Sequence, residues 1–540
     1  MAFPGEGDYG LYYDGIYGYI PIRPVLRRAL NLKTMQRLRR LKQLATLDLF
    51  FPGATHTRFA HSVGVYHIAS RILEHLIAAQ HDRDKRVDWP PITPTHLVAT
   101  QLAALFHDVG HGPFSHVFEL FCKRHRAYGE YMHESVSETL ITKGIGEFND
   151  IPVFLNEVRE SFQLRGVPGD PKFLMPQNIA KMSQGEPPPA DPRYHFLSQI
   201  LKCPFDADRM DYLRRDSYYT GVETGRVDIY ELVENTTLAR EEPVKGKETF
   251  NLRIDSRAAV SFEAFLLARD LMYRRVYYNK GHRGHQELII RALREMMQKY
   301  RPEELVIKTD DQMLDLFSEY NSFTKNVAER VRGRMLYEPL PFDINVYQHL
   351  DERAIKRWGE LRKLARDDVF ETEKRIMSKS PLRVGELVVL DIEQIPLTKR
   401  EDYFEKYLLD TQTGRSVSLI QVLPHLLLTR GSVVDVRTDK MVDLGATYLN
   451  MLTNLSAFAP PDLCGEFVHH LKERLGPSAT LPDIMKLVEI EINTPKCPLK
   501  IVFDEFTGML DLSGGARNDL WEKSLGSMYR YIEGLIERAG

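Results

Sequence analysis

Apolar residues recur at helical spacing over most of the first two thirds of the chain. Between residues 60 and 80 they include Val65, Ile68, Ile72 and Leu76, whose steps of three and four place them on one face of a helix. Similar patterns predict helices within residues 24–44, 95–108, 258–280, 283–300 and 345–365. The sequence therefore predicts a mainly α fold.

The hydrophobic pattern changes character in two places. Residues 235–255 have the pattern of a hairpin and a strand, and beyond about residue 383 the stretches "LRVGELVVLDI" and "GSVVDVRTD" are rich in β-branched residues. Helices are predicted again at about 462–475 and 515–538. We therefore predict a helical domain over residues 1–380 and a smaller C-terminal α/β lobe over residues 381–540.

Charge and composition exclude several classes of protein. The 540-residue chain has 72 Lys and Arg against 75 Asp and Glu, so no global basic field favours nucleic acid as the main partner. The four cysteines form no CxxC pair, which fits reduced thiols. The N-terminus does not resemble a signal peptide, and no apolar run approaches the ~18 residues of a membrane span. We expect a cytoplasmic protein that does not enter a membrane.

Two histidines and two carboxylates form a chemically matched set. His61, the adjacent pair His107 and Asp108, and Asp208 offer nitrogen and oxygen donors that suit divalent metals. Adjacent His and Asp side chains can share one ion only where a helix ends, and the glycines and proline of "GHGP" predict that end. Any one of these histidines alone is more often an ordinary polar residue, but the set predicts a metal site for Mn, Fe, Mg, Zn, Ni or Co.

Further titratable side chains surround the same motif. His111, His116, His133 and Glu134 could move protons, and imidazole suits this role because its pKa lies near neutrality. A divalent ion lowers the pKa of bound water and neutralises phosphoryl charge, whereas ester cleavage also needs a proton on the leaving oxygen. The combination favours phosphate-ester hydrolysis.

Six segments, spanning roughly residues 30–285, match one known family in order. They are "MQRLRRLKQL", "FFPGATHTRFAHSVGVYH", "LFHDVGHGPFSH", "HES", "DADRMDYLRRDSYYTG" and "ARDLMYRRVYYNK". The sequence resembles the HD superfamily of phosphohydrolases, in particular the dNTP triphosphohydrolases that couple a SAM domain to an HD domain, and bacterial dGTPase-like HD proteins. No SAM domain is expected here, because only 34 residues precede the first segment. The resemblance implies cleavage of a dNTP to a deoxynucleoside and tripolyphosphate.

The resemblance also implies roles for individual residues. It implies that His61, His107, Asp108 and Asp208 hold the metal and that His116 protonates the leaving 5′-oxygen. It also implies that the catalytic residue His111 lies beside the α-phosphate and that His133 and Glu134 complete the acid–base group. The implied phosphate-binding residues are Arg58, Arg209, Tyr212 and Arg269. The implied sugar-binding residues are Gln43, Leu44, Asp216 and Tyr277. Without the resemblance, the arginines would be interpreted as surface residues and the tyrosines as core residues.

Regulation and assembly follow from the same resemblance. Family members form dimers or tetramers around activating nucleotides, and the matching positions here are Gln36, Arg39, Arg257, Arg275 and Lys280. Asn31 stands where the family has a guanine-reading aspartate, and an asparagine offers only one acceptor oxygen. Asp255 replaces a basic residue. We therefore expect a homo-oligomer whose activation by nucleotides is absent or altered in base specificity.

Two other functions remain open. The chain could be an HD phosphohydrolase that acts on another nucleotide or on a nucleic-acid end. It could also be a non-catalytic scaffold that senses nucleotides or binds nucleic acid. Leu44, Tyr277 and the arginines favour a dNTP, and the complete metal-ligand set together with His116 argues against a scaffold.

Overall fold

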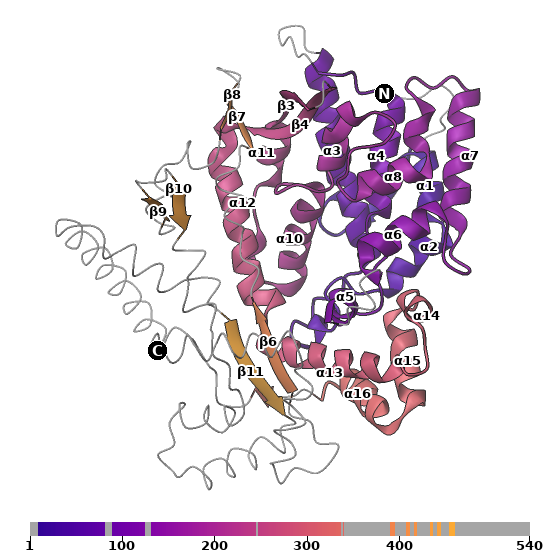
Figure 1. The fold of residues 1–540 in the computed structure, drawn as a ribbon, viewed down its shortest axis with the longest axis vertical. Coiled ribbons are helices and arrows are strands. Elements are labelled where there is room, and N and C mark those ends of the chain that lie inside the picture. Colours follow the sequence, from indigo (N-terminus) through magenta and orange to yellow (C-terminus); the bar gives the residue numbers. More distant parts are fainter. Residues whose placement is uncertain are drawn as a thin grey trace, which may run out of the picture.

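The computed structural model describes residues 9–81, 89–124, 131–244 and 247–335, together with short strands between residues 338 and 459. Figure 1 shows a mainly helical molecule with small sheets, which confirms the predicted fold class. The helices predicted at about 345–365, 462–475 and 515–538 lie outside the described residues.

A hairpin precedes the first helices. Strands β1 (Gly10–Asp14) and β2 (Gly18–Ile22) pair antiparallel. The chain then forms α1 (Pro24–Leu30), α2 (Lys33–Arg37) and a 3-10 turn at Leu38–Arg40. The helical pattern predicted within residues 24–44 is therefore divided, because the extended backbone of Leu32 separates α1 from α2.

The next helices form the core of the molecule. They are α3 (Arg58–His81), α4 (Pro94–Phe106), α5 (His116–Arg124), α6 (His133–Thr142), α7 (Asp150–Leu164), α8 (Pro176–Ser183), α9 (His195–Gln199), α10 (Ala207–Thr220) and α11 (Ile229–Glu234). Every residue of α4 from Thr95 to Phe106 is buried, which explains why this segment is apolar all round. Neither α4 nor any other described helix is long and apolar enough to cross a membrane.

The second half of the described region begins with the predicted hairpin, formed by β3 (Thr236–Val244) and β4 (Lys247–Asp255). It continues with α12 (Ala259–Met272), a π-helical turn at Tyr273–Tyr277, α13 (Lys280–Met296), α14 (Pro302–Val306), α15 (Asp310–Tyr320) and α16 (Ser322–Gly333). In Figure 1, α13, α15 and α16 form a group beside α5, and α13 packs against α5.

One sheet joins residues on both sides of the predicted domain boundary at residue 380. Strand β7 (Leu408–Asp410) pairs parallel with β4, and β8 (Arg415–Val417) pairs antiparallel with β7. The other described strands are β5 (Glu338–Pro339), β6 (Val389–Gln394), β9 (Ser432–Asp435), β10 (Lys440–Asp443) and β11 (Thr453–Ala459), with β11 between β5 and β6 and β9 paired with β10. The boundary at 380 stays a prediction.

Candidate active site

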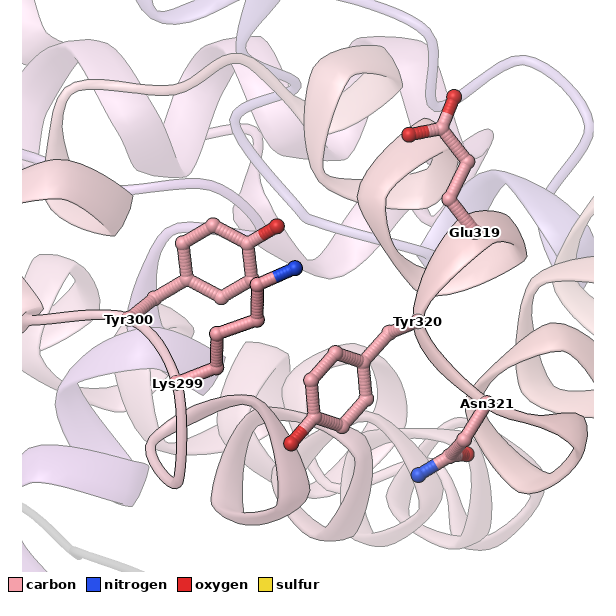
Figure 2. A pocket seen from close by; sticks show the side chains of 5 residues that line it. All are labelled: Lys299, Tyr300, Glu319, Tyr320 and Asn321. Atoms are coloured by element: carbon pink, nitrogen blue, oxygen red, sulfur yellow. The ribbon is translucent and has the colours of Figure 1, made fainter.

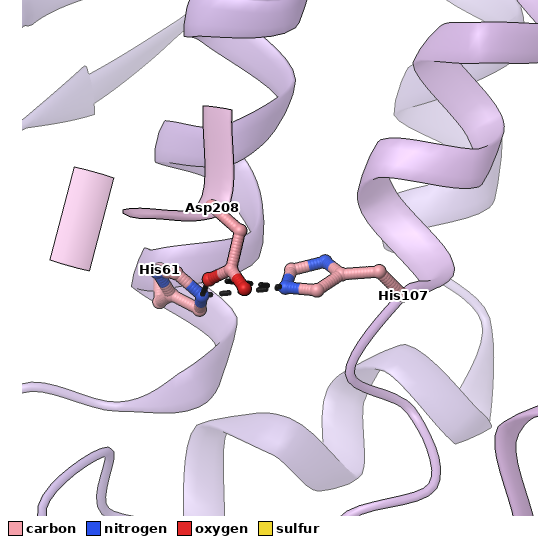
Figure 3. A group of neighbouring side chains, drawn as sticks. All are labelled: His61, His107 and Asp208. Carbon is pink, nitrogen blue, oxygen red and sulfur yellow. Dashed lines mark hydrogen bonds and ion pairs between the residues drawn. The ribbon is translucent and has the colours of Figure 1, made fainter. Parts of the chain in front are cut away.

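Three helices bring His61, His107 and Asp208 to one point. His61 lies in the first turn of α3, His107 directly follows α4, and Asp208 lies in the first turn of α10. Figure 3 shows His107 approaching from one side and His61 with Asp208 from the other. The Nε2 atoms of the two histidines are 3.3 Å apart, and Oδ1 of Asp208 lies 3.0 Å from the Nε2 atom of His61. These side chains can offer three ligand atoms to one ion.

Asp108 adjoins both histidines. Its Oδ1 atom lies 3.2 Å from Nε2 of His107, and its Oδ2 atom lies 3.6 Å from Nε2 of His61. This is possible because α4 ends at Phe106 and the backbone turns, as the motif predicts. Arg58 donates a hydrogen bond to the Oδ2 atom of Asp108. The four residues predicted as metal ligands therefore lie together, while their role as ligands stays a prediction.

Second partners fix the orientation of both imidazole rings. The Nδ1 atom of His61 lies 2.7 Å from Oδ2 of Asp211, and Nδ1 of His107 lies 2.8 Å from the carbonyl oxygen of Ala104. Since Nδ1–H is the donor in each contact, both Nε2 lone pairs face the centre, as metal-bound histidines require. Burial opposes a charge on His61, but Asp208 and Asp211 outweigh it and raise the pKa of His61 to about 10. The site thus favours a positive charge, which fits a bound cation.

A buried ionic chain behind His61 was missed from the sequence. Asp211 accepts two hydrogen bonds from Arg215, at 2.9 and 3.0 Å, and Arg215 also reaches Asp14 in the N-terminal hairpin at 3.0 Å. A Cβ atom at Gly64 would lie only 1.9 Å from Asp211, so a glycine is needed where α3 meets α10. The available signal was the spacing of Asp208, Asp211 and Arg215, which places all three on one face of α10.

Beside the metal-ligand set, Glu119 on α5 stands among three histidines. Its Oε2 atom lies 3.0 Å from Nδ1 of His116, its Oε1 atom is hydrogen-bonded to His133, and Nδ1 of His111 lies 3.7 Å away. The rings of His111 and His133 stack, with centroids 4.2 Å apart. Glu134 lies 3.2 Å from Nδ1 of His133. The predicted acid–base residues are therefore neighbours, and Glu119, three positions after His116, is the residue that sequence reasoning missed.

The surroundings of Glu119, His133 and His111 favour charge on the first two and oppose it on the third. Burial alone would raise the pKa of Glu119, but the charge of His133 and the hydrogen bond from His116 hold it well below its usual range. Burial lowers the pKa of His133, whereas the neighbouring carboxylate of Glu119 raises it by more. Burial and the charges of Arg58 and His133 push the pKa of His111 well below its usual value. His111 is therefore neutral next to a charged carboxylate–imidazole pair.

The residues assigned to phosphate binding differ in their surroundings. Arg58 is buried, and its Nη2 atom has no hydrogen-bond partner within the described part of the chain. Arg269 lies over the ring of Tyr273, with its Nε and Nη1 atoms buried and not hydrogen-bonded to any described residue. Arg209 instead donates to the carbonyl oxygen of Cys203 at 2.8 Å. Arg58 and Arg269 are thus the arginines best prepared for an added anion.

Of the residues assigned to the sugar, Tyr277 lies in direct contact with Asp216. Its two carboxylate oxygens contact His56 at 2.8 Å and the hydroxyl of Tyr277 at 2.7 Å, while the rings of Tyr212 and Tyr277 lie edge to face. Oε1 of Gln43 is buried and, within the described ranges, has no hydrogen-bond partner. Leu44 packs against the core. His56 also belongs to this group through its contact with Asp216, and sequence reasoning missed it although it lies two residues before Arg58.

The residues assigned to an activator are engaged with their neighbours. Gln36 donates to the carbonyl oxygen of Leu30 at 2.7 Å and accepts from Arg39 at 3.0 Å. Arg257 pairs with Asp255 at 2.9 Å. Arg275 is exposed, and the side chain of Lys280 lies outside the described residues. Their regulatory role stays a prediction.

A separate hollow lies away from this site. Figure 2 shows it at the end of α13 and the junction of α15 with α16, where Lys299, Tyr300, Glu319, Tyr320 and Asn321 enclose about 460 Å³. It shares no residue with the candidate active site. The chemistry therefore rests on the histidine–carboxylate cluster.

Comparison with protein families supports this assignment. Residues 58–173 match the family model of the HD domain, and residues 227–403 match that of the HD associated region. These matches show an HD domain followed by an HD associated region in this chain. Relatives of the chain include proteins named deoxynucleoside triphosphate triphosphohydrolase.

Curated relatives match only part of their own length. The uncharacterized protein YwfO of Bacillus subtilis is 30% identical over 303 residues, which cover 55% of this chain and 59% of the relative. The deoxynucleoside triphosphate triphosphohydrolase SAMHD1 of Danio rerio is 29% identical over 283 residues, 50% of this chain and 42% of the relative. The chain thus spans about half the length of these relatives.

Solved structures share the fold. A hypothetical protein from Aquifex aeolicus has a TM-score of 0.56 at 23% identity, covering 85% of this chain and 98% of that one. A phosphohydrolase from Bacteroides thetaiotaomicron has a TM-score of 0.53 at 21% identity, covering 84% and 99%. At these identities the likeness concerns the fold alone.

Proposed function

We propose that the chain is a metal-dependent dNTP triphosphohydrolase, which cleaves a dNTP into deoxynucleoside and tripolyphosphate. One observation carries the proposal: the cation-favouring group of His61, His107, Asp108 and Asp208 lies beside the acid–base cluster around Glu119. Hydrolysis of a phosphate ester needs both kinds of group. A divalent ion held by those four residues would lower the pKa of bound water and neutralise phosphoryl charge.

The arginines would bind the triphosphate. A tripolyphosphate leaving the site carries several negative charges, which require cationic groups placed before the reaction. Arg58 is held by Asp108 and by Ser115, and its Nη2 atom keeps a donor for a phosphate oxygen. Arg269 offers buried donors as well. Arg209 and Tyr212 would complete the phosphate site, with Arg209 leaving the carbonyl of Cys203.

His116 would donate the proton to the leaving 5′-oxygen. Its side chain is 68% exposed, so it can reach a bound substrate. Its Nδ1 atom contacts Glu119, which leaves Nε2 as the atom that can carry a proton to the substrate. His111, held neutral, can donate one hydrogen bond to a phosphoryl oxygen, and His133 and Glu134 maintain the charge balance around Glu119.

The sugar would bind against Asp216, Gln43, Leu44 and Tyr277. Asp216 is a buried acceptor, and Gln43 has a buried carbonyl oxygen, so a hydroxyl group between them would find partners. Leu44 and Tyr277 would form the wall beneath the sugar that leaves no room for a 2′-hydroxyl. Names of relatives such as SAMHD1 support the same substrate class.

Assembly and regulation belong to the same proposal. We expect a homo-oligomer, a dimer or a tetramer. Activation by a nucleotide would be absent or altered, because Gln36 and Arg39 are hydrogen-bonded to each other and Arg257 forms an ion pair with Asp255. A comparison of dATP hydrolysis with and without GTP tests this expectation, and strong guanine-specific activation would contradict it.

Product identification tests the function. The purified chain is incubated with each dNTP and each rNTP, with Mn²⁺ or Mg²⁺, and the products are separated by chromatography. Deoxynucleoside plus tripolyphosphate, from dNTPs only, is the expected result. A monophosphate plus pyrophosphate would refute the proposal, and so would equal cleavage of rNTPs. Hydrolysis of neither substrate would favour another ester or a non-catalytic scaffold.

A further inference from the structure

The turn that leads into His116 has an unusual backbone. Phe114 and Ser115 have φ angles of 58° and 53°, so two consecutive non-glycine residues adopt the left-handed conformation. Each such residue is disfavoured, and the conformation persists only where surrounding contacts enforce it. Both residues are buried, and α5 begins at His116 directly after them. The direction in which α5 starts therefore depends on what holds this turn.

Asp310, almost two hundred residues away in sequence, holds the turn. Its Oδ1 atom accepts from the backbone N–H of Phe114 at 2.7 Å, and its Oδ2 atom accepts from the backbone N–H of Lys42 at 2.9 Å. Ser115 connects the same two segments directly, because its hydroxyl donates to the carbonyl oxygen of Lys42 at 2.9 Å. One buried carboxylate thus joins the loop that precedes α5 to the segment that precedes Gln43.

The carboxylate is itself firmly placed. Asp310 is the first residue of α15, and Thr309 and Gln312 form a capping box around it. Phe317, two turns further along α15, stacks on the ring of Phe114 with centroids 6.3 Å apart. Arg37 adds a second connection, since it donates to the carbonyl oxygens of Val109 and His111 at 2.7 and 2.8 Å and to that of Lys308 at 3.3 Å.

We propose that Asp310 is a positioning residue for the reaction, which holds the left-handed Phe114–Ser115 turn and thereby sets His116 opposite the metal-ligand residues. The role in catalysis rests on the proposed function. Asp310 has no direct contact with His61, His107 or Asp208, and its link to Asp108 runs only indirectly, through Ser115 and Arg58. Its removal should therefore displace the proton donor and leave metal bound. A misplacement of about 1 Å can cost on the order of a hundredfold in rate.

The test compares Asp310→Asn with Asp311→Asn. Both positions lie in the first turn of α15, so both substitutions remove one negative charge from the N-terminus of the helix. Asp311 is exposed, so only Asp310→Asn also changes the buried contacts with the turn. Asparagine has a single acceptor oxygen, so the amide of Lys42 or of Phe114 loses its partner. Asp310→Asn should lower kcat for dNTPs by roughly ten- to a hundredfold, with metal content unchanged. Hydrolysis of bis(p-nitrophenyl) phosphate, whose phenolate leaves without a proton, should fall much less.

Amide hydrogen exchange provides a readout that does not depend on activity. In Asp310→Asn, exchange at Lys42 or Phe114 should become about tenfold faster, and in Asp311→Asn it should stay at the parent rate. Unchanged exchange, or loss of bound metal together with activity, would refute the proposal. Should Asp310→Asn not fold, Asp310→Glu is used instead: its carboxylate keeps both acceptor oxygens but lies one methylene further out, so the turn should shift and kcat should fall while metal stays bound. Should the parent hydrolyse no dNTP, the proposed function fails and hydrogen exchange alone decides whether Asp310 holds the turn.

Discussion

The Nε2 atoms of His61 and His107 lie 3.3 Å apart, while the Nδ1 atom of each ring is occupied by another partner. Two nitrogen lone pairs at this separation repel each other unless a positive charge lies between or beside them. Asp208 and Asp108 add negative charge to the same point. The relationship predicts that a proton and a metal ion compete for this position, so metal binding should weaken as the pH falls.

Removal of one histidine and its neighbour should abolish both metal binding and hydrolysis. In the double variant His107→Ala with Asp108→Ala, two of the four donors are lost, so bound metal measured by mass spectrometry and dNTP turnover should both reach background. Circular dichroism should show a folded chain, because the core of α4 is unchanged. His81→Ala, an exposed histidine on α3, is the control. Turnover at the parent rate in the double variant would disprove the assignment of the site.

Asp211→Asn should weaken metal binding without removing a ligand. The carboxylate orients His61 through its Nδ1 atom, and loss of such a partner typically costs about 10- to 100-fold in metal affinity or activity. Arg215 keeps its contact with Asp14, which limits the loss of stability. Metal titration of the variant, with the surface variant Asp315→Asn as control, measures the effect. Equal affinity in the two variants would show that His61 needs no support.

Glu119→Gln should slow the reaction while metal stays bound. An amide cannot balance the positive charge of His133 as the carboxylate does, and Nδ1 of His116 loses its charged partner, so proton transfer should slow. We expect a smaller loss than for His116→Gln, whose turnover should fall by about 10²- to 10⁴-fold, as is typical of acid–base groups. Glu147→Gln, at an exposed ion pair with Lys33, serves as control. If Glu119→Gln hydrolysed dNTPs at the parent rate, Glu119 would have no role in the reaction.

Stability should fall below about pH 6.5, where free histidine titrates. Burial lowers the pKa of His96 and His285 to about 4 and that of His282 to about 3, so these rings are neutral in the folded chain. The unfolded chain then binds more protons between pH 6.5 and about 4, and the free energy of unfolding decreases as the pH falls through this range.

His285→Leu isolates one of these contributions. Neither ring nitrogen of His285 has a hydrogen-bond partner among the described residues, so leucine replaces it without breaking a bond. Between pH 7 and pH 4 the free energy of unfolding should decrease in the parent by up to about 3 kcal/mol more than in the variant. Urea unfolding at both pH values measures this difference. His81→Leu should behave like the parent. An identical acid response in both variants would contradict the depressed pKa of His285.

The sequence predicted the helices and the metal-ligand set because both depend on local signals. Apolar spacing identified α3 and α4, and the break after Asp108 is encoded by glycines and proline in the same motif. The long pattern at 258–280 was interpreted as one helix, yet a π-helical turn at Tyr273–Tyr277 interrupts it. Periodicity does not distinguish the two, because a π turn inserts only one extra residue into a regular helix.

The supporting residues were harder to predict because their partners are distant in sequence. Asp211 and Glu119 each lie three positions from a predicted site residue, so helical spacing could have suggested them. Asp310 carries no such signal, since the carboxylate acts on backbone N–H groups at residues 42 and 114 that have no side-chain signature. Resemblance to a family transfers positions one by one, whereas these contacts arise only from the packing of α15 against the turn.

The parallel pairing of β7 with β4 has a practical consequence for dividing the chain. Leu408 is fully buried, and Tyr407 accepts from the backbone of Ile254 at 3.0 Å and packs its ring on Phe205, three residues before Asp208. A fragment that stopped at residue 380 would expose the hydrogen-bonding edge of β4, and open strand edges recruit other chains. Strands β7 and β8 therefore protect the edge of β4 from pairing with other chains, and any shortened version of this protein should retain them.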